Sequence, residues 1–107
     1  MPTKYLPFTA VHPGGAREIN FPLHEHTVNA DHVSAMLEAL LESISEGIQL
    51  RRNVSDGDVL QAMCIALAIR MHLVEAAPDA VRAMVAATLE QADDAVAESV
   101  IVPASRA

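Results

Sequence analysis

The stretch from Gly57 to Val74 is apolar on two opposite sides when it is drawn as a helix. Its few polar residues are confined to narrow seams between these sides. Burying a large aliphatic side chain contributes about 1.5–3 kcal/mol, so neither side is expected to stay in water. At 100° per residue, the first side carries Leu60, Met63, Leu67, Met71 and Val74, and the second carries the predicted interface residues Ile65, Ile69 and Leu73.

Apolar residues at spacings of three and four predict three helices, near residues 29–48, 56–76 and 78–98. The first is expected to begin with Asn29 as its N-cap, and the second with a capping box between Ser55 and Asp58. Pro78 suits the first position of the third helix, where its missing N–H group costs nothing. We therefore expect a tight turn between the second and third helices.

Residues 1–27 differ from the rest of the chain, because they hold four of the six prolines and all three aromatic residues. The sequence His12-Pro-Gly-Gly15 predicts a turn between two short runs, Tyr5–Val11 and Arg17–Leu23. Pro7 and Pro22 each remove a donor from a strand ladder, which restricts such strands to sheet edges. The segment is thus predicted to be an extended arm or a short β-hairpin, docked through its aromatic rings.

The predicted fold class is mostly α: a three-helix antiparallel bundle preceded by an extended arm or hairpin. No long linker or internal repeat divides the chain, so residues 1–107 are predicted to form one domain. Within it we expect an arm over residues 1–27, a helical bundle over 28–100 and a tail over 101–107. Residues 100–102 either add a short strand beside Ile19–Leu23 or fray.

The composition narrows the classes of function. Hydrophobic residues make up 51% of the chain and aromatic residues 3%, so the core must be aliphatic. The net charge is −7, and residues 30–100 hold twelve acidic residues against four arginines, so that Arg51-Arg52 is the one pair of adjacent cations. A surface that follows nucleic-acid phosphates needs clustered cations, and nucleic acid is therefore disfavoured as a partner.

Cysteine content and hydropathy predict a cytoplasmic protein. Cys64 is the only cysteine, so no intrachain disulfide is possible, and its place in an apolar run predicts a buried, inert thiol. The first residues lack the features of a secretory signal. The longest uncharged apolar run, residues 62–69, is too short to span a bilayer, so no membrane association is expected.

Four histidines within 21 residues form the one constellation that suggests chemistry. Imidazoles two residues apart on an extended strand point to the same side and can share a metal ion such as zinc. No Glu-x-x-His pair and no cysteine supports them, so exposed or helix-terminal histidines are the competing interpretation. The candidate metal ligands are His24 and His26, completed by His12 or His32.

The sequence offers no catalytic constellation. His72 has no serine, cysteine or acid at helical spacing that completes a nucleophile and base, and Gly14-Gly15 lacks the surroundings of a phosphate loop. The first hypothesis is therefore a small non-enzymatic interaction protein that acts as a helical homodimer, without a cofactor. The alternative is a small-molecule or metal-binding module that uses the histidines of the N-terminal arm.

Overall fold

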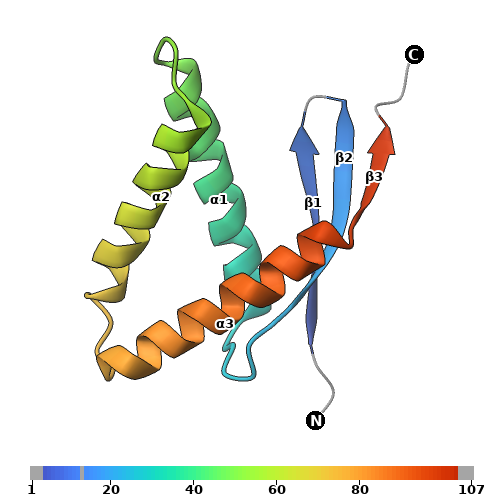
Figure 1. Cartoon of the computed structure of the whole chain (residues 1–107). Helices are drawn as coiled ribbons and strands as arrows, with labels where there is room; N and C mark the ends of the chain where they lie inside the picture. Colours follow the sequence, from blue (N-terminus) through green and yellow to red (C-terminus); the bar gives the residue numbers. More distant parts are fainter. Residues whose placement is uncertain (1–3, 13, 104–107) are drawn as a thin grey trace. The chain divides into compact units, whose positions relative to one another are not determined.

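The computed structural model describes residues 4–12 and 14–103, which form a β-hairpin, three helices and a third strand (Figure 1). The mostly helical class is confirmed, and the N-terminal arm is a regular hairpin. Residues 104–107 of the predicted tail lie outside the described residues. In chain order the elements are β1 (Tyr5–His12), β2 (Gly15–Pro22), α1 (Ala30–Gln49), α2 (Asp56–Met71), α3 (Pro78–Ala97) and β3 (Val100–Pro103).

The hairpin pairs β1 and β2 antiparallel over their full length, from Tyr5 opposite Pro22 to His12 opposite Gly15. Gly14 in the turn has a φ of 96°, a left-handed conformation that glycine adopts without a steric penalty. The turn predicted from the glycine pair is therefore confirmed at this position.

The short C-terminal strand β3 completes a three-stranded sheet in the order β1-β2-β3. It pairs antiparallel with the first half of β2, with Val100 opposite Glu18 and Pro103 opposite Gly15. The predicted strand is confirmed, but its partner is nearer the hairpin turn than residues 19–23. Beyond Glu18, the corresponding edge of β2 extends past the start of β3.

Both outer strands of the sheet carry a proline whose backbone faces away from β2. The Leu23 N–H donates to the Lys4 carbonyl at 2.8 Å, so in β1 the even-numbered residues face β2 and Pro7 faces outward. The register of β3 likewise turns Pro103 outward. An outward proline withholds an N–H group from any added strand, so both edges are poor templates for further pairing.

One face of the sheet holds the core of the described residues. Leu6 and Ile19 are 7% and 5% exposed, and no other hydrophobic side chain of the described residues is buried. Phe8 and Phe21 lie on the same face with ring centroids 6.5 Å apart. Tyr5 lies on the opposite face, so the aromatic residues do not act together as anchors.

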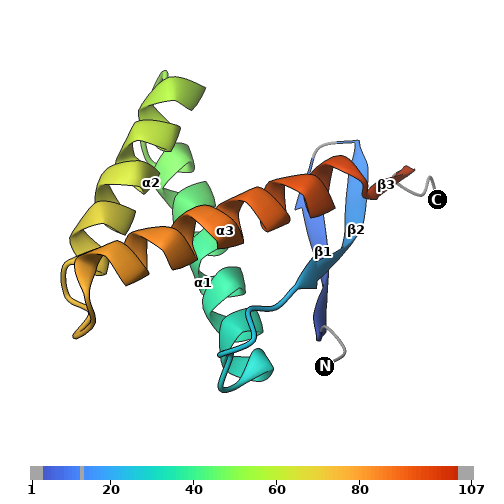
Figure 2. The ribbon, with the colours of Figure 1, turned by 60° about the horizontal axis from the view of Figure 1, so that its bottom comes forward.

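The second half of α3 crosses this inner face of the sheet (Figures 1 and 2). The Arg17 guanidinium extends from that face and donates to the Val96 carbonyl at 3.5 Å and to Ser99 Oγ at 3.1 Å. Ser99 Oγ also donates to the Val96 carbonyl at 2.6 Å. Carbonyl groups in the last turn of a helix lack partners within the helix, and a cation satisfies them favourably. Arg17 therefore fixes the end of α3 on the sheet.

Helices α1 and α2 begin at the caps that the sequence predicts. Asn29 Oδ1 accepts from the N–H groups of Asp31 and His32 at 2.9 and 3.2 Å, and Ser55 Oγ accepts from the Asp58 N–H at 3.1 Å. Between the helices, Asn53 adopts a left-handed conformation with a φ of 59°. Asparagine tolerates this conformation better than most residues, which suits it to the turn.

Helix α2 ends at Met71, earlier than the predicted end at residue 76. The N–H groups of Leu73 and Val74 bond three residues back, to Arg70 and Met71, so the chain tightens and leaves the helix. The residue before a proline is disfavoured in helical conformation, and Pro78 begins α3. The connection therefore spans residues 72–77, and the tight turn expected there is wrong.

The described parts of residues 1–34 and 85–107 form one compact unit, and residues 35–84 form another. The second half of α3 thus belongs to the same unit as the strands. Within the second unit, α1 and α2 are close together at the loop that connects them and become farther apart toward their other ends (Figures 1 and 2). None of the described helices has both the length and the apolar composition that crossing a membrane requires.

Candidate functional site

The most extensive candidate site is the apolar surface of α2. No side chain of this helix is buried. On the first side, Leu60 is 61% exposed near the start of the helix and Met63 and Leu67 are each 43% exposed, whereas on the second side Ile65 is 53% and Ile69 62% exposed. Along the middle of α2, the side predicted as an interface is therefore the more open of the two.

Leu73, the third predicted interface residue, does not lie on α2. It follows the end of the helix, in the connection to α3, and is 67% exposed. The prediction that it continues the helical ridge is wrong, because the helix ends two residues before it. Leu73 still adds apolar area next to the last turn of α2.

Helix α1 carries a second apolar stripe within the same unit. Leu37 and Ile44 are partly covered, and Leu41 and Ile48 are about two-fifths exposed. Twelve large apolar side chains between residues 36 and 74 are exposed. They are Met36, Leu40, Leu41, Ile48, Leu50, Leu60, Met63, Ile65, Leu67, Ile69, Leu73 and Val74.

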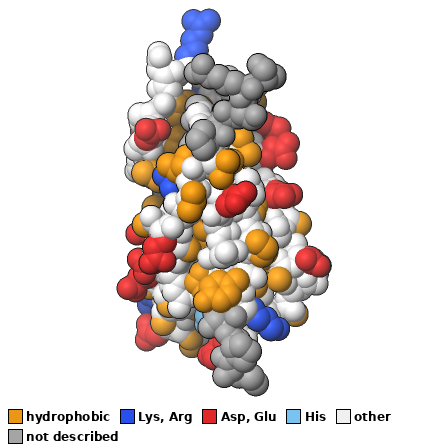
Figure 3. Space-filling model, turned by 90° about the vertical axis from the view of Figure 1, so that its right-hand side faces the viewer, with side chains coloured by type: hydrophobic (Ala, Val, Ile, Leu, Met, Phe, Trp, Pro, Cys, Tyr) orange, Lys and Arg blue, Asp and Glu red, His pale blue; other side chains and the backbone are white. Residues whose placement is uncertain are grey.

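The charged side chains of α1 and α2 lie away from this apolar surface. Glu38, Glu42 and Glu46 repeat every four residues on the side of α1 opposite its apolar stripe. In α2, no charged residue lies between Asp58 and Arg70. Figure 3 draws a different face, the side where the strands lie in Figure 1, and shows separate acidic side chains among apolar ones.

The thiol of Cys64 is exposed on α2, so the prediction of a buried cysteine is wrong. The apolar neighbours that suggested burial belong to α2, in which no side chain is buried. The prediction failed because an apolar run shows which residues favour burial and does not show what buries them.

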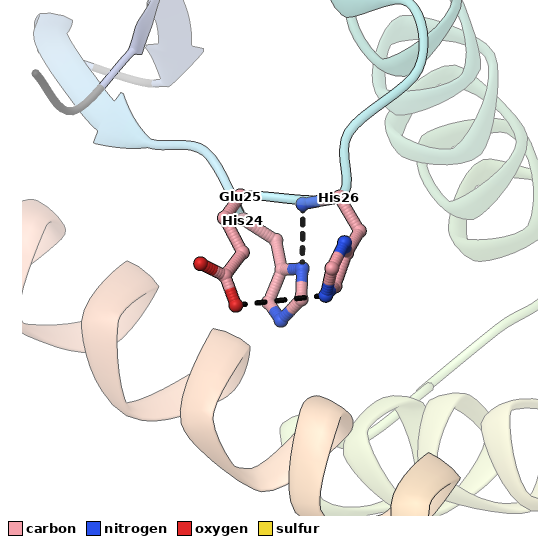
Figure 4. A network of polar contacts seen from close by, with 3 residues as sticks. All are labelled: His24, Glu25 and His26. Carbon is pink, nitrogen blue, oxygen red and sulfur yellow. Dashed lines mark hydrogen bonds and ion pairs between the residues drawn. The ribbon is translucent and has the colours of Figure 1, made fainter. Parts of the chain in front are cut away.

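Of the four candidate histidines, the structure brings His24 and His26 together. His24 and His26 lie in a turn after β2 and not on an extended strand, yet their ring centroids are 5.1 Å apart (Figure 4). The turn is closed by a hydrogen bond from the Thr27 N–H to the His24 carbonyl at 2.9 Å. Glu25 Oε1 lies 3.5 Å from Nε2 of His26, and both side chains are largely exposed.

A hydrogen bond within the turn uses one nitrogen of His24. The backbone N–H of His26 donates to Nδ1 of His24 at 3.1 Å (Figure 4). A neutral imidazole that accepts at Nδ1 carries its proton on Nε2, so neither nitrogen then offers a free lone pair to a metal.

The other two histidines are not gathered with this pair. His12 ends β1 opposite Gly15, at the hairpin turn, while His24 follows the far end of β2. At about 3.3 Å per residue, the length of β2 separates them by roughly 25 Å. His32 lies in the first turn of α1. Among the residues described, no group of three or more potential ligands could hold a metal ion.

A hollow of about 480 Å³ lies in the first unit, beside the part of β2 that extends past β3. Its titratable side chains include three exposed carboxylates, those of Glu18, Asp94 and Glu98. The sequence did not predict it, although Glu18, Asn20 and Pro22 alternate along one strand face. The lining residues are Tyr5, Glu18, Asn20, Pro22, Gln91, Asp94, Ala95, Glu98, Ser99 and Val100.

Arg51 has a structural partner. Its Nη1 donates to the Gly47 carbonyl at 3.0 Å, in the last turn of α1. Such a bond satisfies a free carbonyl and places a cation at the negative end of the helix. This bond engages one member of the adjacent pair Arg51-Arg52.

Comparison with protein-family models, with curated proteins and with solved structures gave no match. The function is therefore argued from the chain's own residues.

Proposed function

We propose that this chain is a small non-enzymatic interaction protein of the cytoplasm that acts as a homodimer through its helices. The observation that carries the proposal is the exposure of Ile65 and Ile69 on one side of α2 while the other side is also incompletely covered. Monomeric proteins rarely expose apolar side chains in such a continuous series. The sequence predicts antiparallel packing of the three helices within one chain, and we extend that prediction here to packing between the helices of two copies.

The sheet edges are the competing route to self-association, and their chemistry disfavours it. A strand added to β1 would meet Pro7, and one added to β3 would meet Pro103, each without an N–H group at an outward position. The helical surface needs no backbone pairing, since apolar side chains pack without directional bonds. Assembly through the helices is therefore the better-supported mode.

The alternative, a metal-binding module, has one observation in its favour, the closeness of the His24 and His26 rings. The bond to Nδ1 of His24 weighs against it, as does the distance of His12 along β2. The homodimer remains the proposed function.

The proposal is tested by the mass of the untagged protein in solution. Light scattering at about 50 µM is expected to give twice the chain mass of 11.4 kDa, since a specific dimer is held together at such concentrations when Kd is micromolar or lower. A mass of one chain would contradict the homodimer.

Ile69→Glu is the matching variant, because a charge buried without a partner opposes association. It is expected to give a single-chain mass or an unfolded chain. Gln61→Glu is the control, since it adds the same charge to a polar seam of α2 and is expected to leave the dimer intact. Equal effects of the two substitutions would show that charge, and not the Ile69 surface, disrupts the dimer.

A further inference from the structure

The helices of a single chain lack a core of their own. None of α1, α2 and α3 contains a buried residue, and the buried hydrophobic residues described, Leu6 and Ile19, lie in the sheet. Isolated helices of 16 to 20 residues, as these are, are marginal in water, because most helical stability in proteins comes from tertiary packing. The order of α1 and α2 therefore requires a surface that the single chain does not supply.

We infer that this surface is a second copy of the chain, and that α1 and α2 become stably folded only when the helices of two copies pack into one four-helix core. This inference rests on the proposed function, because it names how the homodimer is held together. It assigns the α1 stripe and both sides of α2 to the same buried core. The dimer is then the folding unit of this half of the protein.

The exposed apolar area matches what a stable dimer needs. Full burial of a large aliphatic side chain removes about 60–120 Å² of apolar surface from water. With roughly half of that exposed on each, the twelve side chains between residues 36 and 74 offer about 400–700 Å² per copy. A standard interface buries about 800 Å² per partner, of which roughly 60% is apolar.

The charges also favour a second copy. Each chain carries a net charge of −7, so two copies repel one another unless their acidic residues stay apart. Glu38, Glu42 and Glu46 lie opposite the apolar stripe of α1, and residues 59–69 of α2 are uncharged. Two such surfaces meet without opposing carboxylates. These surfaces also carry no charge that would attract an oppositely charged partner.

The test is urea unfolding of the full-length untagged chain at about 1 and 100 µM, followed by far-UV circular dichroism. If folding of α1 and α2 is coupled to association, the midpoint of helix loss is expected to rise by about 1 M urea over this hundredfold range. Sedimentation across the same urea series should show the dimer and the helical signal disappearing together. This result supports the inference.

Two other outcomes separate the inference from the proposed function. A dimer that dissociates at low urea into a single chain with its helical signal retained would overturn coupled folding and leave the homodimer standing. A single-chain mass with full helical signal and a midpoint independent of concentration would overturn both. Gln61→Glu, measured in parallel, should reproduce the wild-type shift, whereas Ile69→Glu should lose about two-thirds of the helical signal at either concentration, the share of α1 and α2 in the three helices.

Discussion

At the scale of single residues, three polar side chains finish a helix or join it to the sheet. Arg17 binds the end of α3, Arg51 binds the end of α1, and Ser55 caps the start of α2. Each satisfies backbone groups that a helix end leaves free. Arg17 differs from the other two, because its partners lie 79 and 82 residues away in the chain.

Arg17→Met is expected to lower the free energy of unfolding by about 1–2 kcal/mol, since a partly buried charged donor is lost from the Val96 carbonyl and Ser99 Oγ. Urea unfolding measures it. Arg82→Met is the control, because its ion pair with Asp79 at 3.0 Å is exposed and lies within one helix. Its effect is expected to stay below about 0.5 kcal/mol. Equal losses of unfolding free energy in the two variants would contradict the role of Arg17 in fixing α3 on the sheet.

Replacing both His24 and His26 by Asn is expected to leave the melting temperature and the mass unchanged, with or without zinc. The reason is that His26 is exposed and His24 is partly exposed, and that a backbone bond uses Nδ1 of His24. Calorimetry with equimolar zinc is the measurement. Stoichiometric zinc in the untagged wild-type protein, lost in the double variant, would instead support the metal-binding alternative.

At the scale of elements, the hairpin turn and the helix interior require different backbone conformations. Two glycines show the difference. Gly14 adopts a positive φ in the hairpin turn, whereas Gly47 is helical in α1. Neither lacks space for a methyl group: a Cβ at Gly14 meets nothing within 4 Å, and one at Gly47 meets only Arg51 Nη1 at 3.9 Å. Conformation, and not crowding, therefore decides the effect of a substitution.

Gly14→Ala is expected to destabilise the protein by about 1 kcal/mol, because alanine is strained in the left-handed region. Gly47→Ala is expected to stabilise it by about 0.5–1 kcal/mol, because alanine favours a helix interior over glycine. Thermal unfolding of both variants provides the comparison, and each serves as the control of the other. Stability changes of the same sign in both variants would contradict a left-handed Gly14 and a helical Gly47.

At the scale of the whole molecule, association is the expected source of stability for the helical residues. The sheet has two buried hydrophobic side chains among the residues described, and the helices have none. A chain of 107 residues normally buries well over half of the surface that it exposes when unfolded. In the proposed dimer, a second copy would cover the apolar residues of α1 and α2.

Cys64 reports on this association without any substitution, as it is the only thiol in the chain and is exposed on α2 of a single copy. Its labelling by a thiol reagent is expected to slow at least tenfold between about 1 and 100 µM protein, because the dimer encloses both sides of the helix. The rate in denaturant, which should not depend on concentration, is the control. Native labelling that is equally fast at both concentrations would place Cys64 outside the interface.

Local signals in the sequence were sufficient for the ends of several elements and for the class of the fold. The cap residues Asn29 and Ser55, the glycine turn and Pro78 act within about four residues of themselves, so their effects can be deduced from neighbouring positions. The apolar periodicity likewise located the exposed side of α2 that carries Ile65 and Ile69. The clustering of His24 and His26 also followed from closeness in the chain.

The tertiary structure alone decided the features that join distant residues. The register of β3 on β2, the bond from Arg17 to the end of α3 and the hollow beside Glu18 depend on segments that lie some 80 residues apart in the chain. An apolar residue favours burial without specifying its cover, which is why Cys64 was predicted to be buried and is exposed. Periodicity determines which side of a helix avoids water, whereas the partner of that side is set by contacts that no local pattern encodes.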